Sequence, residues 1–593
     1  MNLIGQQIVL KEFGKMIKDY RKMKDEMKSK GEIPEWYSSN ALQFFMDKYS
    51  YEGESVKSRD KTVAKTLAKF APEKKPKWWE KDPYTKGKSY EEVFFSVIWD
   101  GYAVPSTPLK SNAGLPTRGL TVSCCGQHME NNLASKAFVR GELEVLIKNS
   151  HGCSLSVSDW LSEGTVYDSD GNISDGIIPV IDELQDSTQA VSQNIRRGQT
   201  LMAVNVLHGD FDRVANKLYA ESDSLNISWL ITDEFVGLLK NGDKEAVRKF
   251  GRILQIRMRS GKGYLTFIDK MNRNKAQVFK DNNLKVQASN LCNEVNLPAN
   301  EEYSFTCVII NANLAVYDDF PEHLFHILHI MQDCNVSNYI SEIEKKTGLN
   351  ALFLSKVLKF TKDFRAVGTG VCGFHSYLMK KRIVFGSMES MLVNEQIFKR
   401  MKEEVTDTSK WLASVLGEPP MMKGTGLRNA TTMMMPPTKS SAELAKDSPT
   451  ESINPETALI RVKETVGGDI FRINTELLKV MKELGQYNKE NVAFIAENKG
   501  SVQKCDWMPQ ELKDVFRNAF EIPMEAHLDL CSQRQKHIDQ QQSINLYFSG
   551  DDKPEYIAEM HKKAMLDDWC NGLYYCYSSR GGSYERFGCE MCE

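Results

Sequence analysis

The chain has 593 residues, with 76 Lys and Arg against 79 Asp and Glu, which gives a formal net charge of −3. This balance argues against a protein that binds nucleic acid through bulk positive charge. The sequence has no apolar run of about 18 residues and no apolar signal-peptide core, so no membrane-spanning segment or secretion is expected. Thirteen Cys without such a signal predict a reducing, cytoplasmic compartment, and their odd number disfavours a disulfide framework.

The first 90 residues predict a helical region. Apolar residues recur at helical spacing within the charged segment 11–30, and a second helix is expected over 63–70. The segment 90–99 predicts a further helix. After it, residues 106–114 and 122–126 are rich in Ser, Thr and Gly and predict a loop-strand-loop unit. Such units often hold phosphates through hydroxyls and backbone amides, although ordinary turns have the same composition.

Further along, helical patterns alternate with short apolar runs at 152–157, 196–204, 263–268 and 306–310. This alternation is typical of an α/β protein with a mostly parallel sheet or barrel. The Gly-rich run 367–374 does not fit the G-x-G-x-x-G register and has no clear strand before it, so a dinucleotide-binding Rossmann loop is excluded.

The segment 288–298 combines a thiol, a carboxylate and amides within an apolar frame. If it is extended, Asn290, Cys292 and Glu294 project from one face, with successive Cα atoms about 6.6 Å apart. In a helix, Cys292 would point away from the other two. The pattern predicts a thiol and a general base presented together on a loop tip. The alternative is a buried strand with an inert Cys, because free Cys is usually a small hydrophobic residue.

Three later segments carry further candidate chemistry. The run 436–441 leads through two prolines into Thr and Ser before a helix former, which makes either an anion site or an ordinary N-cap at Thr438 or Ser440. Tyr574 and Tyr575 form a pair that, taken alone, is more often aromatic core. The Gly-rich C-terminal segment is expected to be mobile and ends in Cys-x-x-Cys, a thiol pair prone to oxidation unless it is used.

Taken in order, these motifs resemble the catalytic subunit of class I ribonucleotide reductases. The matching residues are Thr107-Pro108 with Asn112-Ala113, Ser123-Cys124, Asn290/Cys292/Glu294, Thr306-Cys307 with 311–314, 437–441, and Tyr574-Tyr575 before the terminal Cys-x-x-Cys. Each motif alone is weak, but their common order is specific. The resemblance implies a ten-stranded α/β barrel with a central finger loop over 91–578. An N-terminal helical region would occupy 1–90 and a flexible redox-active tail 579–593.

The resemblance also implies a role for each site residue. Cys292 would be the thiyl radical that abstracts the ribose 3′-hydrogen, Glu294 the base for the 3′-hydroxyl proton, and Asn290 a hydrogen-bond partner of the ribose. Cys124 and Cys307 would supply two electrons. Tyr574 and Tyr575 would transfer the radical, and Cys589 and Cys592 would re-reduce the Cys124–Cys307 disulfide. The residues expected at the diphosphate and sugar are Thr107, Ser123, Gly152, Pro437, Thr438, Lys439, Ser440 and Ser441.

The implied reaction is the reduction of ribonucleoside diphosphates to 2′-deoxyribonucleoside diphosphates for DNA synthesis. The implied partners are a radical-generating small subunit with a metal cofactor, a second copy of the chain, and thioredoxin or glutaredoxin as reductant. No metal or cofactor is expected in the chain itself, and a dNTP or ATP effector with Mg²⁺ is left open. The effector site would lie near 130–135 and 159–176.

Two departures from the family pattern are expected. No ATP cone precedes the catalytic region, so dATP should not switch the enzyme off through one. The segment 217–225, at the expected place of the specificity-transmitting loop, is short and lacks the usual arginine, which puts effector control of substrate choice in doubt.

Two alternatives stay open. A cobalamin-dependent class II reductase would share Cys292, Glu294 and the dithiol but would not need the tyrosine pair. A catalytically inactive homologue would bind nucleotides or the small subunit as a regulator. The remaining cysteines are interpreted as packing residues: Cys125, Cys153, Cys334, Cys372, Cys505, Cys531, Cys570 and Cys576.

Overall fold

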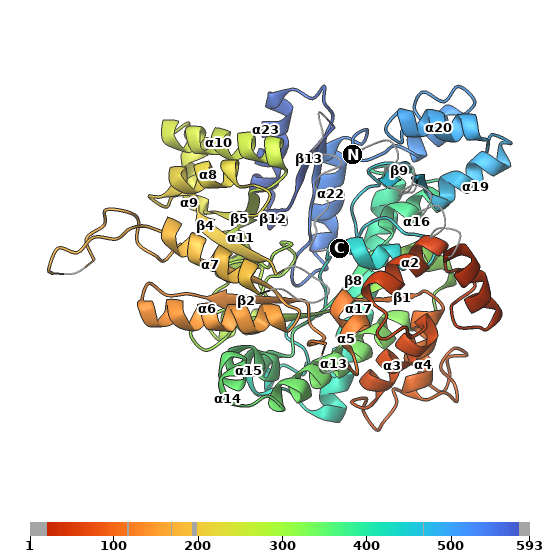
Figure 1. Cartoon of the computed structure of the whole chain (residues 1–593), viewed down its shortest axis with the longest axis horizontal. Helices are drawn as coiled ribbons and strands as arrows, with labels where there is room; N and C mark the ends of the chain where they lie inside the picture. The colour runs from red at the N-terminus through yellow and green to blue at the C-terminus, as the bar shows by residue number, and fades with distance from the viewer. Residues whose placement is uncertain (1–19, 116–117, 168, 192–197, 466–467, 580–593) are drawn as a thin grey trace, which may run out of the picture.

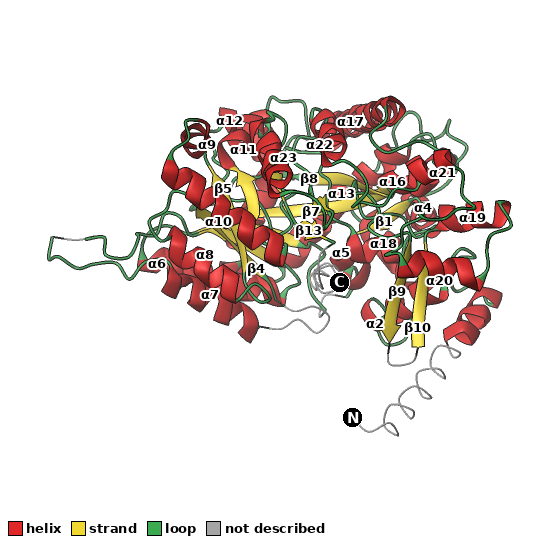
Figure 2. Cartoon of the chain, turned by 90° about the horizontal axis from the view of Figure 1, so that it is seen from above, coloured by secondary structure: helices red, strands yellow, loops and turns green. Residues whose placement is uncertain are grey.

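The computed structural model describes residues 20–115, 118–167, 169–191, 198–465 and 468–579 (Figure 1). Cys589 and Cys592 therefore lie outside the described residues, as do the first residues of the run 196–204. Figure 2 shows most of the strands at the centre of the molecule with helices around them. Among the described residues, every helix is too short or too polar to cross a lipid bilayer.

Nine strands form the main sheet, in the order β1-β7-β2-β3-β4-β5-β6-β12, with β8 also paired to β7. They are β1 Ala103–Pro105, β2 Cys124–His128, β3 Gly152–Ser156, β4 Thr200–Asn205, β5 Asn226–Ile231, β6 Tyr264–Phe267, β7 Phe305–Asn313, β8 Val367–Cys372 and β12 Gly572–Leu573. Strands β2 to β6 run parallel. The outer neighbours β7 and β12 run antiparallel to β2 and β6.

Two extended segments, 431–435 and 540–546, close this sheet into a barrel between β8 and β12. The first segment joins β8, because the backbone N–H of Thr369 donates to Thr432 O at 2.8 Å. The two segments join each other through the N–H of Met435, which donates to Gln541 O at 3.0 Å. The second segment joins the chain just after β12, where the N–H of Tyr574 donates to Ile544 O at 2.8 Å. With strands β2 to β8 and β12, they make ten barrel positions. The predicted ten-stranded α/β barrel is confirmed, with β1 as an additional strand.

Helices pack around the barrel, most of them following a strand. They are α2 Ser39–Lys48, α3 Val56–Ala68, α4 Tyr90–Trp99, α5 Thr107–Asn112, α6 Leu133–Lys148, α7 Ile178–Ala190, α8 Phe211–Ala220, α9 Asp233–Lys240, α10 Lys244–Ser260, α11 Ile268–Asn274, α12 Gln277–Asp281, α13 Leu324–Glu344, α14 Gly348–Phe353, α15 Ser355–Phe364, α16 Phe374–Lys380, α17 Met388–Leu416, α18 Lys439–Glu443, α19 Thr475–Glu483, α20 Lys489–Glu497, α21 Gln510–Val515, α22 Met524–Gln535 and α23 Pro554–Leu566. Two small sheets, β9 Ile460–Thr465 with β10 Gly468–Ile473 and β11 Leu546–Phe548 with β13 Cys576–Ser578, complete the architecture.

The predicted helix over 90–99 is confirmed as α4, whose Ser89 and Glu92 form a capping box. Helix α3 packs against α4 and α13, so the N-terminal helices contact the barrel region directly. The domain boundary at residue 90 stays a prediction.

One local prediction was wrong, and two further segments have a structure that the sequence analysis did not specify. Residues 107–112 form helix α5 instead of a loop, because Pro108 suits the first turn of a helix. The Gly-rich run forms β8, where a side chain at Gly370 would collide with Asn311 and Pro436. Helix α8 extends to Ala220, so only the first four residues of the segment 217–225 are helical.

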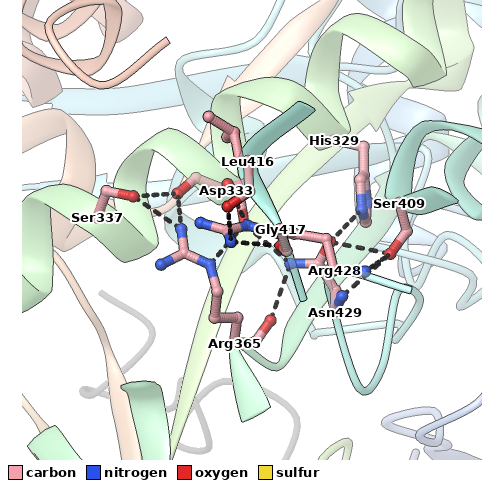
Figure 3. Close-up of polar contacts among 9 residues, drawn as sticks. All are labelled: His329, Asp333, Ser337, Arg365, Ser409, Leu416, Gly417, Arg428 and Asn429. Carbon is pink, nitrogen blue, oxygen red and sulfur yellow. Dashed lines mark hydrogen bonds and ion pairs between the residues drawn. The ribbon is translucent and has the colours of Figure 1, made fainter. Parts of the chain in front are cut away.

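A buried ion-pair network ties α13 to the start of β8 and to the segment after α17 (Figure 3). Asp333 accepts hydrogen bonds from Arg365 Nε at 2.8 Å and from Asn429 Nδ2 at 3.1 Å, and Arg428 Nε lies 3.4 Å away. Burial acts to raise the pKa of Asp333, but Arg365 and Arg428 outweigh burial and lower the pKa from 3.8 to about 2. The network fixes the segment that leads into the barrel position 431–435.

Replacing Asp333 by Asn should destabilise the protein by about 3–5 kcal/mol, because the buried Arg365 and the partly buried Arg428 lose their counter-charge. The folded pKa is depressed, so the stabilisation is complete above pH 3.8 and is lost as the pH falls towards 2. Between pH 3.8 and pH 2, the denaturant concentration at the unfolding midpoint should therefore change less with pH in the variant than in the wild type. Asp212→Asn, which breaks an exposed pair with Arg248, is the control. An unchanged midpoint for Asp333→Asn would contradict this role.

Candidate active site

The predicted finger loop is confirmed as a buried segment inside the barrel. Residues 288–299 are buried and adopt neither helix nor strand. The loop reaches two walls: Asn290 Nδ2 lies 3.4 Å from Cys124 Sγ on β2, and Thr266 on β6 donates to Asn293 Oδ1 at 3.0 Å. These contacts hold the loop across the barrel interior.

The tip of the loop is a turn at Leu291 and Cys292, so the alternative of a buried strand does not hold. Asn293 N donates to Asn290 O at 3.1 Å, and Asn293 has a left-handed φ of 62°, which Asn tolerates better than most residues. Asn290 Oδ1 accepts from the backbone N–H of Glu294 at 3.0 Å and of Val295 at 3.2 Å. Asn290 thus shapes the turn while its amide nitrogen faces Cys124, and the loop-tip interpretation holds.

The two thiols predicted to supply electrons lie directly opposite each other. Cys124 and Cys307 are register partners across the antiparallel pair β2–β7, and both are reduced. Directly opposed Cβ atoms in such a pair are about 4.5–5.5 Å apart, close to the roughly 3.5–4.5 Å of a disulfide. Burial raises the pKa of Cys307 well above its usual value, and electrostatic interaction with Cys124 and Glu294 raises the pKa further. Cys307 therefore stays protonated, and it lies close enough to interact electrostatically with the Glu294 carboxylate.

The tyrosine pair contacts the loop tip. Tyr574 OH donates to Cys292 Sγ at 3.6 Å, and the rings of Tyr574 and Tyr575 lie 4.4 Å apart between centroids. Tyr575 stacks on the partly exposed Tyr577 at 5.4 Å, and buried Arg257 donates to Tyr574 O at 3.0 Å. An aromatic chain thus leads from Cys292 towards the surface.

The predicted phosphate loop 437–441 precedes and begins helix α18. Thr438 has a left-handed φ of 54° and does not cap the helix with its side chain, so the N-cap interpretation was wrong for Thr438. Its Oγ1 instead accepts from Ser452 N at 2.8 Å. The Ser440 hydroxyl is buried and has no hydrogen-bond partner among the described residues. A buried hydroxyl without a partner is costly, which indicates a site for a polar ligand.

The other predicted substrate residues lie on neighbouring elements. Ser123 O accepts from Gly152 N at 2.7 Å, which places the starts of β2 and β3 side by side. Thr107 begins α5, and its hydroxyl lies 2.9 Å from Tyr49 OH. Helix α18 packs against β1, the strand just before α5. Their common role in binding substrate stays a prediction.

Sequence reasoning missed the residues behind the loop. Gln541 Nε2 donates to Asn293 O at 2.6 Å and to Ser289 Oγ at 3.1 Å, and Gln541 N donates to Glu294 O at 3.1 Å. Ser543 Oγ lies 3.2 Å from Glu294 Oε2. The run Gln540-Gln541-Gln542-Ser543 was a usable signal, because amides next to a strand-like apolar segment need buried partners.

The family model "Ribonucleotide reductase, barrel domain" matches residues 244–425 and 418–575. A putative ribonucleoside-diphosphate reductase large subunit of frog virus 3 is 29% identical over 507 residues, 82% of this chain and 86% of that protein. The large subunit of invertebrate iridescent virus 3 is 31% identical over 59% of this chain and 55% of its own length. The structure of the class Id ribonucleotide reductase alpha subunit of Actinobacillus ureae is 28% identical, covers 93% of this chain and 99% of its own, and superposes with a TM-score of 0.80. Since the family model spans more than half of the sequence, the chain belongs to the ribonucleotide reductase family.

Proposed function

We propose that the chain is the catalytic large subunit of a class I ribonucleoside-diphosphate reductase. One observation carries the proposal: the loop tip brings Cys292 to a tyrosine hydroxyl at 3.6 Å. On the same loop, Asn290 lies 3.4 Å from Cys124, which is opposite Cys307. A radical thiol, a route for the radical and a two-electron donor thus lie around one loop.

The reaction follows from these positions. The Cys292 thiyl takes the 3′-hydrogen of the ribose, and Glu294 accepts the 3′-hydroxyl proton. The 2′-hydroxyl leaves as water with a hydrogen from one thiol of the Cys124–Cys307 pair, and C2′ receives the other. The two thiols lose two electrons and form one S–S bond. Cys292 returns its hydrogen to C3′, Glu294 returns the proton to the 3′-oxygen, and the thiyl is regenerated.

The class I enzyme needs a small subunit, whose metal cofactor supplies the oxidising equivalent. Tyr575 and Tyr574 pass this equivalent inwards, and the Tyr574 oxyl takes the hydrogen of Cys292. The hydroxyl-to-sulfur contact favours this route over the cobalamin-dependent alternative, which has no use for the pair. The inactive-homologue alternative is disfavoured because the sequence keeps Cys292, Glu294 and both thiols of the expected dithiol.

The loop 437–441 binds the diphosphate, and the buried Ser440 hydroxyl supplies one donor. Thr107, Ser123 and Gly152 line the sugar side. In the tail, Cys589 and Cys592 reduce the Cys124–Cys307 disulfide by thiol exchange and are themselves reduced by thioredoxin or glutaredoxin.

The chain functions as a homodimer. The start of α6 and the protruding hairpin before α7 (Figure 1) expose large apolar side chains: Leu133 by 73%, Val166 by 59% and Ile173 by 59%. Exposed apolar groups of this kind mark contact surfaces. Sedimentation should show a dimer that Val166→Glu shifts towards monomer.

The test of the function is conversion of CDP to dCDP with dithiothreitol. Turnover that requires a small subunit from the same source supports the proposal. Turnover without that subunit but with adenosylcobalamin would move the chain to class II. Nucleotide binding without turnover in either assay would make the inactive homologue the better account.

A further inference from the structure

Ser543 lies where the finger loop meets the barrel wall. Its Oγ is 2.5 Å from the carbonyl oxygen of Cys292 and 3.2 Å from Glu294 Oε2. The side chain is fully buried, and its backbone N–H donates to Met435 O at 3.0 Å, which fixes its position on the wall. One hydroxyl therefore contacts both the radical-bearing residue and the base.

A serine hydroxyl has one hydrogen to donate and lone pairs that accept. When Glu294 is ionised, the hydroxyl can donate to its carboxylate, a charge-assisted bond roughly twice as strong as a neutral one. When Glu294 is protonated, its carboxyl donates to Ser543 Oγ, and the serine hydrogen turns to the Cys292 carbonyl. The direction of the hydroxyl thus follows the proton on Glu294.

The backbone around Glu294 is fixed by hydrogen bonds, so only the side-chain hydrogens are free to reorient. Gln541 N fixes the Glu294 carbonyl at 3.1 Å, and Asn290 Oδ1 holds Glu294 N at 3.0 Å. The backbone on both sides of the base is therefore held, and the proton can be relayed without moving the loop.

We propose that Ser543 is a positioning residue that couples the protonation of Glu294 to the backbone of Cys292. As Glu294 takes the 3′-hydroxyl proton, the Ser543 hydrogen turns from the carboxylate to the Cys292 carbonyl and donates a hydrogen bond to it. When Glu294 returns the proton to the product, the Ser543 hydrogen turns back to the carboxylate. This coupling rests on the proposed function, since that function makes Glu294 the base.

The test compares Ser543→Ala with Ser543→Thr, which keeps a hydroxyl. The base must be ionised to work, and loss of its donor disfavours the carboxylate. In the plot of kcat against pH, the acid limb of Ser543→Ala should therefore lie about one pH unit higher than that of the wild type. A shift of this size is expected when a charged group loses one hydrogen bond. Substrate KM should stay unchanged, and Ser543→Thr should return the limb to its wild-type position.

Ser289→Ala is the matched control, because Ser289 donates to Val295 O at 2.7 Å on the same loop without touching the Glu294 carboxyl. It should leave the acid limb in place even if it loosens the loop. An unmoved limb in Ser543→Ala, or an equal shift in Ser289→Ala, would overturn the proposal.

A second readout is independent of turnover. The protonated-carboxyl infrared band of Glu294, identified by its loss in Glu294→Gln, should titrate about one pH unit higher in Ser543→Ala. If this titration shifts while the wild type does not reduce CDP, the proposed function fails and the Ser543–Glu294 coupling stands. An unshifted titration would overturn the coupling alone.

Discussion

Replacement of Cys292 by Ser is expected to abolish nucleotide reduction, with a loss of at least about 10³-fold in turnover, because the remaining groups act only as a unit with the thiol. The substituted hydroxyl holds its hydrogen too strongly for the Tyr574 oxyl to take. Substrate binding should persist, since the proposed diphosphate site is the separate loop 437–441. The measurement is dCDP formation with the small subunit, together with CDP affinity.

Cys505→Ser is the control for the loss of a buried thiol, because Cys505 packs in a separate cluster with Leu477 and Phe516. This variant should turn over normally. Substantial activity in Cys292→Ser would show that the loop tip is not the radical site.

Replacement of Cys307 by Ser is expected to stop product formation by at least about 10²-fold while leaving the first hydrogen transfer intact. Without Cys307 no disulfide can form with Cys124 across β2–β7, and only one thiol hydrogen is available. Cys292 and Tyr574 are untouched, so the 3′-hydrogen is still abstracted. The measurement is tritium release from 3′-tritiated CDP beside dCDP formation.

Cys125→Ser is the control on the same strand. Cys125 lies one residue from Cys124 but points to the other face of β2, where its Sγ is 3.2 Å from Cys153 Sγ. It should retain reduction. Full dCDP formation by Cys307→Ser, or its loss in Cys125→Ser alone, would assign the electrons to a different pair of thiols.

Much of the site could be predicted because its chemistry is concentrated in short segments. The spacing of Asn290, Cys292 and Glu294 indicated a loop tip, and the loop is indeed a buried turn. The turn itself was not predicted, because it depends on the Asn290 side chain binding two backbone N–H groups. Side-chain bonds of this kind compete with regular structure and leave little trace in hydrophobic periodicity.

The residues behind the loop could not be assigned to the site, because barrel closure brings them there. Ser543 and Gln541 follow the finger loop by about 250 residues in sequence. The alternation of strands and helices predicted a parallel sheet or barrel, and the family resemblance implied the barrel, but neither indicated which extended segment closes it. Likewise, β8 was missed because Gly370 is required by the close approach of Pro436 and Asn311, a contact between distant segments.

The most direct test of the account is the fate of the cysteines after one turnover without external reductant. The sample is the Cys589→Ser/Cys592→Ser variant with its small subunit and CDP, and the products are dCDP and disulfides mapped by mass spectrometry. The account predicts one Cys124–Cys307 disulfide for each dCDP and neither product when Cys292 is replaced by Ser. Formation of dCDP with both thiols still reduced, or with a disulfide elsewhere, would contradict it.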